Sequence, residues 1–409
     1  MRFTTRLIQG LGVLGFAAAI SLFAGCGGGG GGGGSSSSSG SSSSGSNSAA
    51  VTVNNGVSGF PNIPTVSVTV CAPGSTTNCQ TINNVQVDTE SFGLRVVSGA
   101  VSQVLGSLPQ TTINGSGLVE CTVFADNTHT LGSVRTANVQ IAGETASNLP
   151  IQIIGDQSSS LSPLGCGGTG ENTAQDLGAN GILGIGVASI DCPACVNAAV
   201  SPAYYTCSGS TCTPTAVPAA QQVTNPVTQF ATDNNGVILT LPAVSSGGNS
   251  SASGTLVFGI GTQSNNANTA SNKFTTSAFG DVNGTLNGST VSQAFFDSGS
   301  NAYFIDSSLA PSPLNSSTSL CTGSAKGFYC PPSTVSVPIT VQSISGTGSV
   351  SSLSLSVANA NSLFSSNNFA YNNLGGPLSG KLDIGLPFFY GRSVFYGYAS
   401  GSQSPYVAL

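Results

Sequence analysis

The sequence repeats one short pattern, first as Val85-Gln-Val-Asp88-Thr89-Glu90-Ser91 and again as Ala294-Phe-Phe-Asp297-Ser298-Gly299-Ser300. Each copy is an apolar strand that ends in Asp, followed by a hydroxyl residue, a turn position and Ser. Further along, each half has an apolar segment with glycine, Gly181–Gly186 in the first and Leu382–Leu386 in the second. One Asp-Ser-Gly-Ser turn is a weak signal because these residues form turns anywhere. The duplicated pair predicts two equivalent halves.

Several segments around these turns alternate apolar and polar residues with period two, as half-buried strands do. They are Pro64–Val70, Ala137–Ile141, Val335–Val341 and Ser352–Val357. Asn54-Asn55-Gly56, Asn283-Gly284 and Asn287-Gly288 are turn signals. The sequence therefore predicts an all-β class.

Charge is scarce: the 409 residues include 8 Lys+Arg, 14 Asp+Glu and one His, or 5% charged residues, against about 25% in a typical soluble domain. A single histidine, His129, excludes multi-histidine metal centres. The few basic residues beyond Arg2 and Arg6 exclude a nucleic-acid patch. No phosphate-binding loop or G-x-S-x-G elbow is present. We expect no metal, no cofactor and no nucleic-acid partner, and any chemistry must use carboxylates.

The N-terminus predicts export. Residues 1–25 hold two arginines, an apolar stretch from Leu11 to Phe23 and then small residues before Cys26. This ending resembles a bacterial lipoprotein cleavage site, which makes Cys26 the expected lipidation site; the alternative is a plain secretory signal with an incidental cysteine. Residues 26–50, rich in Gly and Ser, predict a flexible tether. We expect an exported protein, lipid-anchored to the cell envelope, on the outer membrane.

Ten cysteines remain after Cys26, an even number that predicts up to five disulfides in an exported chain. Near neighbours are plausible pairs: Cys71 with Cys79, Cys207 with Cys212, and Cys321 with Cys330. Spacing alone does not fix the connectivity. A metal or redox role for Cys192-Pro-Ala-Cys195 is the weaker alternative in this compartment.

Together, the two Asp turns and the two glycine segments resemble the pepsin-like aspartic peptidases, and the layout is also similar to a group of uncharacterised exported bacterial lipoproteins. Gly254–Gly261, Val134–Gly143 and Ile384–Phe389 are similar to further strands of that family. The resemblance implies a bilobal all-β fold with a central cleft. It implies an N-terminal lobe over 51–262, with a Cys-rich insert at about 188–235, and a C-terminal lobe over 263–409.

The resemblance also implies the site residues. Asp88 and Asp297 are the expected catalytic pair of an aspartic endopeptidase, supported by Thr89, Ser91, Ser298, Gly299 and Ser300. Two close carboxylates share one proton, so one takes a proton from water while the other donates to the scissile carbonyl. The expected partner is a peptide or protein, bound by a monomer.

Two positions depart from the family pattern. Glu90 stands where the family has glycine, and a third carboxylate there should raise the pKa of the pair or displace the water, unless it points away. Phe124-Ala125 stands where the family keeps a tyrosine in its flap. The alternative hypothesis is therefore an inactive module that binds a peptide or glycan in the cleft.

Overall fold

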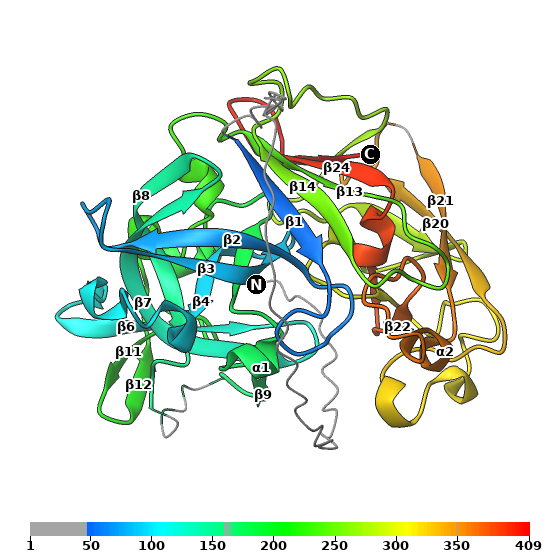
Figure 1. The fold of residues 1–409 in the computed structure, drawn as a ribbon, viewed down its shortest axis with the longest axis horizontal. Coiled ribbons are helices and arrows are strands. Elements are labelled where there is room, and N and C mark those ends of the chain that lie inside the picture. The colour runs from blue at the N-terminus through cyan, green and yellow to red at the C-terminus, as the bar shows by residue number, and fades with distance from the viewer. Residues whose placement is uncertain (1–46, 159–160, 162, 164, 349) are drawn as a thin grey trace, which may run out of the picture.

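The computed structural model describes residues 47–409 except 159, 160, 162, 164 and 349. Two lobes rich in β-strands lie on either side of a sheet that joins them (Figure 1), which confirms the predicted all-β bilobal fold. The export signal and Cys26 lie outside the described residues. Strand β1 (Ser48–Val53) includes three residues of the predicted tether, because they pair along β14.

The first lobe, blue to green in Figure 1, contains the Asp88 turn. Its strands and helix are β2 (Pro64–Cys71), β3 (Cys79–Asp88), β4 (Phe92–Val97), β5 (Thr112–Ile113), β6 (Ser116–Val123), β7 (Thr128–Ile141), β8 (Glu144–Ile154), β9 (Thr169–Gly170), α1 (Ala174–Leu177), β10 (Gly181–Ile185), β11 (Tyr204–Ser208) and β12 (Thr211–Pro214). The β-hairpins β7–β8 and β2–β3 are its longest antiparallel pairings.

The second lobe, yellow to orange, is smaller and contains the Asp297 turn. Its elements are β16 (Asn283–Leu286), β17 (Ser289–Thr290), β18 (Gln293–Asp297), β19 (Tyr303–Ile305), β20 (Val335–Gln342), β21 (Ser351–Val357), α2 (Ala360–Phe364), β22 (Gly375–Pro377) and β23 (Lys381–Gly385). They form two four-stranded sheets, β17-β16-β20-β21 and β18-β23-β19-β22. Short 3-10 turns connect elements in both lobes, at Ser98–Val101, Leu105–Ser107, Pro193–Val196, Ala219–Gln221, Pro226–Gln229, Ser317–Ser319, Gly323–Ala325 and Leu386–Phe389.

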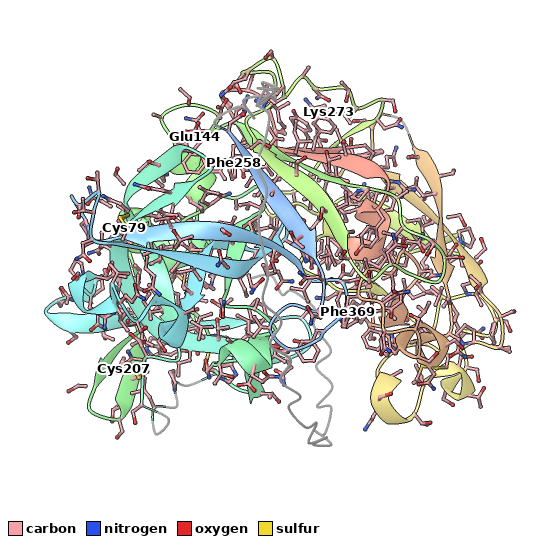
Figure 2. The ribbon with its side chains drawn as sticks, in the orientation of Figure 1. Cys79, Glu144, Cys207, Phe258, Lys273 and Phe369 are labelled. Atoms are coloured by element: carbon pink, nitrogen blue, oxygen red, sulfur yellow. A yellow bond between two sulfur atoms is a disulfide. The ribbon has the colours of Figure 1, made fainter. Side chains whose placement is uncertain are left out.

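The sheet between the lobes draws on both ends of the chain. It runs β15 (Lys273–Thr275), β25 (Tyr406–Ala408), β24 (Arg392–Gly397), β13 (Gly236–Leu241), β14 (Ala252–Phe258) and β1. Figure 2 labels Phe258 and Lys273 in this region, and Lys273 Nζ lies 3.7 Å from the centre of the Tyr406 ring. The last strands of the chain therefore belong to the connecting sheet, although the sequence placed all of 263–409 in the C-terminal lobe.

The alternating patterns predicted strands correctly, whereas one of the predicted turns is wrong. All four alternating segments lie in strands, β2, β7, β20 and β21. Asn287-Gly288 is the turn between β16 and β17, with positive φ at both residues. Asn283-Gly284 is not a turn: it begins β16, where Gly284 pairs with Val341. The prediction was wrong there because sheet pairing overrides a local turn preference.

Five disulfides staple the described chain: Cys71–Cys79, Cys121–Cys166, Cys192–Cys195, Cys207–Cys212 and Cys321–Cys330. The three neighbour pairs are confirmed, and five bridges indicate an oxidising compartment outside the cytoplasm. None of the helices in the described part of the chain has the length and apolar character needed to cross a membrane.

Candidate active site

Each Asp turn follows a buried strand that runs parallel to a glycine-bearing strand of the same lobe. Gly184 of β10 lies opposite Asp88, and Gly385 of β23 lies opposite Asp297. A Cβ at Gly184 would lie 2.6 Å from the Phe92 amide nitrogen, and one at Gly385 would lie 2.0 Å from a carbonyl oxygen. Both strands can thread behind the turns only with glycine at these positions.

The two turns are joined across the lobes by the hydroxyl residues after each Asp. Thr89 Oγ1 accepts a hydrogen bond from the Ser298 amide at 2.9 Å and donates to the Phe296 carbonyl at 3.3 Å. Ser298 Oγ donates to the Val87 carbonyl at 2.9 Å. Because these bonds are buried and reciprocal, they hold the two turns in a fixed relation.

The carboxylates are held in a similar way in each turn. Asp88 Oδ1 accepts from the Glu90 and Ser91 amides at 2.9 and 3.1 Å, and its Oδ2 accepts from Ser91 Oγ at 2.8 Å. Asp297 Oδ1 accepts from the Gly299 amide and its Oδ2 from Ser300 Oγ, both at 2.7 Å. The structure thus brings all seven predicted site residues into one cluster.

Gly299 shows how close the turns come. A Cβ built there would lie 2.6 Å from Asp88 Cγ and 2.7 and 2.9 Å from its two carboxylate oxygens. The φ angle at Gly299 is not positive, so close approach, and not backbone conformation, requires glycine. The Asp88 carboxylate therefore packs directly against the turn of the second lobe.

Negative charge concentrates around Asp297. Its side chain is fully buried, and burial, together with the charges of Asp88, Asp383 and Glu90, holds its pKa well above the usual value. The hydrogen bond from Ser300 opposes this shift in part. Asp297 therefore retains a proton at a pH where an exposed aspartate has lost it.

Glu90 fits the first turn without backbone strain, because its φ is not positive. Only 2% of the residue is exposed, so Glu90 is enclosed within the site region. Its charge contributes to the raised pKa of Asp297, as expected for a third carboxylate near the pair.

Sequence reasoning missed two residues that reach the site. Asp383, in the glycine strand β23, lies 2.7 Å from Ser300 Oγ through its Oδ2. Tyr396, from β24 of the connecting sheet, donates to the Phe296 carbonyl at 2.9 Å. A charged residue inside an apolar strand was the available signal for Asp383, whereas nothing local marks Tyr396.

The hairpin β6–β7, which is expected to be the flap, is held by strand pairing and by ion pairs. Its turn covers 124–127, with Phe124 buried, and the insert strand β11 pairs with β6. Arg95 Nη2 contacts Glu120 of β6 at 2.6 Å and Asp191 of the insert at 3.0 Å.

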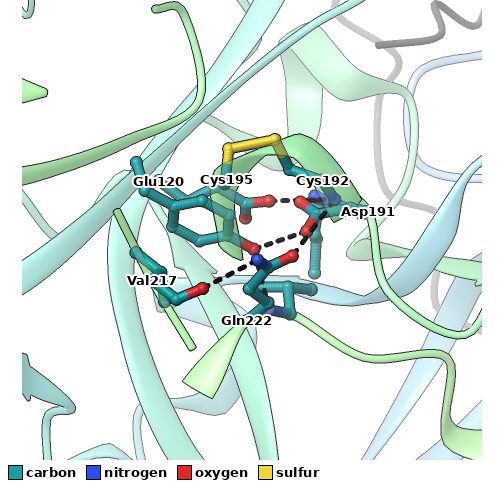
Figure 3. Close-up of a disulfide and its surroundings, with 9 residues drawn as sticks. Glu120, Asp191, Cys192, Cys195, Val217 and Gln222 are labelled. Atoms are coloured by element: carbon teal, nitrogen blue, oxygen red, sulfur yellow. Dashed lines mark hydrogen bonds and ion pairs between the residues drawn. A yellow bond between two sulfur atoms is a disulfide. The ribbon is translucent and has the colours of Figure 1, made fainter. Parts of the chain in front are cut away.

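The insert is itself held in place around Asp191. Tyr204 donates to this carboxylate at 2.6 Å, and the adjacent Cys192 amide donates to Gln222 at 3.3 Å. Figure 3 shows Asp191 beside the Cys192–Cys195 disulfide and close to Glu120. The Cys-rich insert is therefore a buttress for the flap hairpin.

Comparisons with known proteins identify a family for this chain and a solved structure with a similar fold. A family model described as "Protein of unknown function (DUF3443)" matches residues 43–409. The chain belongs to the DUF3443 family. None of the curated proteins matches the sequence of this DUF3443 protein. Among solved structures, the aspartic proteinase from Irpex lacteus is similar, with a TM-score of 0.50 and 16% identity over 88% of this chain and 96% of that one. That likeness shows a pepsin-like fold for the DUF3443 protein.

Within its described residues, no group of three or more His, Cys, Asp or Glu has an arrangement suited to a metal ion.

Proposed function

We propose that this DUF3443 protein is an aspartic endopeptidase in which Asp88 and Asp297 activate water. The observation that carries the proposal is the reciprocal Thr89–Ser298 bracing, which fixes the two Asp turns face to face. Two carboxylates in this relation share one proton. The ionised member removes a proton from water as its oxygen attacks the peptide carbonyl carbon, and the protonated member donates to the carbonyl oxygen. Collapse of the resulting intermediate breaks the C–N bond, while the carboxyl group that took the water proton gives it to the leaving amine nitrogen and the other carboxylate takes the hydroxyl proton.

We further propose that the protein is exported and anchored through lipid on Cys26, with its body held off the outer membrane by the Gly/Ser tether. The five disulfides support an oxidising compartment. The lipobox-like end of the N-terminal segment supports processing at Cys26.

Cleavage of a mixed peptide library by the purified body, between about pH 3 and pH 7, tests the enzyme proposal. Cleavage that a statine-type inhibitor blocks and that Asp297→Asn abolishes supports it, with a loss of about 10²–10⁴-fold expected for removal of an acid–base group. Blank traces for both wild type and variant would reject it.

A binding module without catalysis is the second candidate, and Glu90 favours it. A third carboxylate is buried beside the pair, and Asp88 and Asp297 are only 1% and 0% exposed. The β6–β7 hairpin, which matches the family's flap, also pairs with the insert. Retention of intact peptides or glycans by wild type and Asp297→Asn alike would support this candidate.

A further inference from the structure

Ser300 occupies an unusual position between two carboxyl groups of the second lobe. Its Oγ lies 2.7 Å from Oδ2 of Asp297 and 2.7 Å from Oδ2 of Asp383. Asp297, Ser300 and Asp383 are all fully buried. Both distances are those of good O–H···O hydrogen bonds.

Hydrogen counting limits how this trio can be protonated. A serine hydroxyl carries one hydrogen, and an ionised carboxylate carries none. With both carboxylates ionised, one of the two contacts would set a lone pair against a lone pair in a buried site, at a free-energy cost of the order of a lost hydrogen bond or more. The two carboxyl groups must therefore hold at least one proton between them.

We propose that Asp383 is a positioning residue that shares this proton with Asp297 through Ser300 Oγ. In one state Asp383 Oδ2–H donates to Ser300 Oγ, and the Ser300 hydroxyl donates to Asp297 Oδ2. When the Asp383 proton moves to Ser300 Oγ, the Ser300 proton moves to Asp297 Oδ2, and the total charge is unchanged. Asp297 can thus regain a proton from inside the protein. The shared proton does not depend on the proposed peptidase function; only its effect on catalysis rests on that function.

Among the described residues of the first lobe, the position that matches Asp383 does not carry a carboxyl group. The pairing of Gly184 with Asp88 and of Gly385 with Asp297 makes Ile182 the counterpart of Asp383. Ile182 is apolar, so this position cannot supply a second carboxyl group to the hydrogen-bond chain from Asp88 through Ser91. The relay therefore belongs to one lobe, and it is not a consequence of the duplicated fold.

The surroundings favour retention of the shared proton. The titratable groups whose charges act on Asp297 are Asp88 at the end of β3, Glu90 in the following turn and Asp383 in β23; Tyr396 of β24 also interacts with it. Each of these carboxyl groups raises the pKa of Asp297. Full ionisation would add another buried negative charge to this set, which burial and mutual repulsion both oppose.

Infrared difference spectra at about pH 7 test the relay without any need for activity. Exposed carboxyl groups are ionised at that pH, so the C=O stretch of protonated acids reports buried ones. We expect Asp383→Asn, whose amide can still donate to Ser300, to lose absorbance equivalent to one protonated carboxyl. Asp306→Asn is the matched control, because the pKa of Asp306 is lowered by its hydrogen bonds and its carboxylate is ionised. An unchanged acid band in Asp383→Asn would overturn the proposal.

If the Asn variant does not fold, Asp383→Ile replaces it in the test. Ile is the residue at the matching position of the first lobe, Ile182, and the same loss of acid absorbance is expected. If the protein cleaves peptides, Asp383→Asn should also move the basic limb of kcat/KM down by about one pH unit, or about tenfold in rate beyond that limb. In a Ser300→Ala background this shift should shrink, because the bridge is gone. A wild-type protein that cleaves nothing, but whose acid band decreases in Asp383→Asn, contradicts the peptidase proposal and supports the shared proton.

Discussion

The two Asp turns share a backbone pattern but differ at the third position, where the first lobe has Glu90 and the second has Gly299. Gly299 lies so close to the Asp88 carboxylate that a methyl group would collide with it. Glu90 instead brings a side chain and a negative charge to the region that acts on Asp297. The equivalent turns thus give their two aspartates different environments, one packed against a backbone and one surrounded by carboxyl groups.

The strands beneath the turns differ in the same sense. The register places Arg95 and Ile182 in the first lobe where the second has Phe304 and Asp383. Arg95 forms ion pairs with Glu120 of the flap hairpin and Asp191 of the insert, so this cation of the first lobe links the insert to the hairpin. Asp383 is paired with Phe304 in this register, and it contacts the Asp297 turn through Ser300. Duplication therefore supplies the frame, and unlike substitutions give each half its own electrostatics.

The largest effect is expected from Gly299→Ala, which removes the close approach of the turns. Overpacking against the Asp88 carboxylate should lower the free energy of unfolding by about 1–3 kcal/mol. Displacement of the pair should also lower kcat/KM by about 10²-fold. Urea unfolding and peptide cleavage measure the two effects. Gly99→Ala is the control, because nothing lies within 4 Å of its added Cβ; equal behaviour of the two variants would contradict the packing described.

The asymmetry between the turns should also appear in stability against pH. The native pKa of Asp297 is raised well above its unfolded value, so its contribution is fully present below about pH 4 and is lost as pH rises through the native pKa. We expect the free energy of unfolding to fall by up to about 1.4 kcal/mol per pH unit over that window. Asp297→Asn should flatten this part of the curve, and a curve of unchanged slope would count against the raised pKa.

Glu90→Gly makes the first turn match the second and tests whether Glu90 suppresses activity. Loss of its charge should lower the pKa of Asp297, and loss of its bulk should raise the cleavage rate about tenfold. Glu90→Gln separates the causes, since it removes the charge and keeps the size. An unchanged or lower rate in Glu90→Gly would show that Glu90 is not the obstacle.

The brace between the turns should affect stability alone. Ser298→Ala removes one buried hydrogen bond, to the Val87 carbonyl, and should cost about 1–2 kcal/mol of unfolding free energy. Ser308→Ala removes an exposed hydroxyl of the same lobe and should stay within about 0.5 kcal/mol of wild type. Chemical denaturation compares them, and equal stabilities would show that the brace contributes little.

Features set by residues near one another in the chain were predictable. The Asp turns, the alternating strands and the three short-range disulfides follow from spacings that close locally. The Cys121–Cys166 bridge joins two segments that only the packed lobe brings together, and spacing does not select it. Asn283-Gly284 has a good turn sequence, yet pairing with β20 makes it a strand.

The sequence alone determined the duplicated all-β frame and the two aspartates, because the repeated pattern of strand, Asp and hydroxyl residue can be recognised without the folded structure. Only the tertiary structure decided the surroundings of each aspartate. Glu90 is buried, Gly299 touches the opposite carboxylate, and Asp383 reaches Asp297 through Ser300. These relations join residues 80 or more positions apart or on opposite lobes, and burial makes their charges interact strongly where water would have screened them.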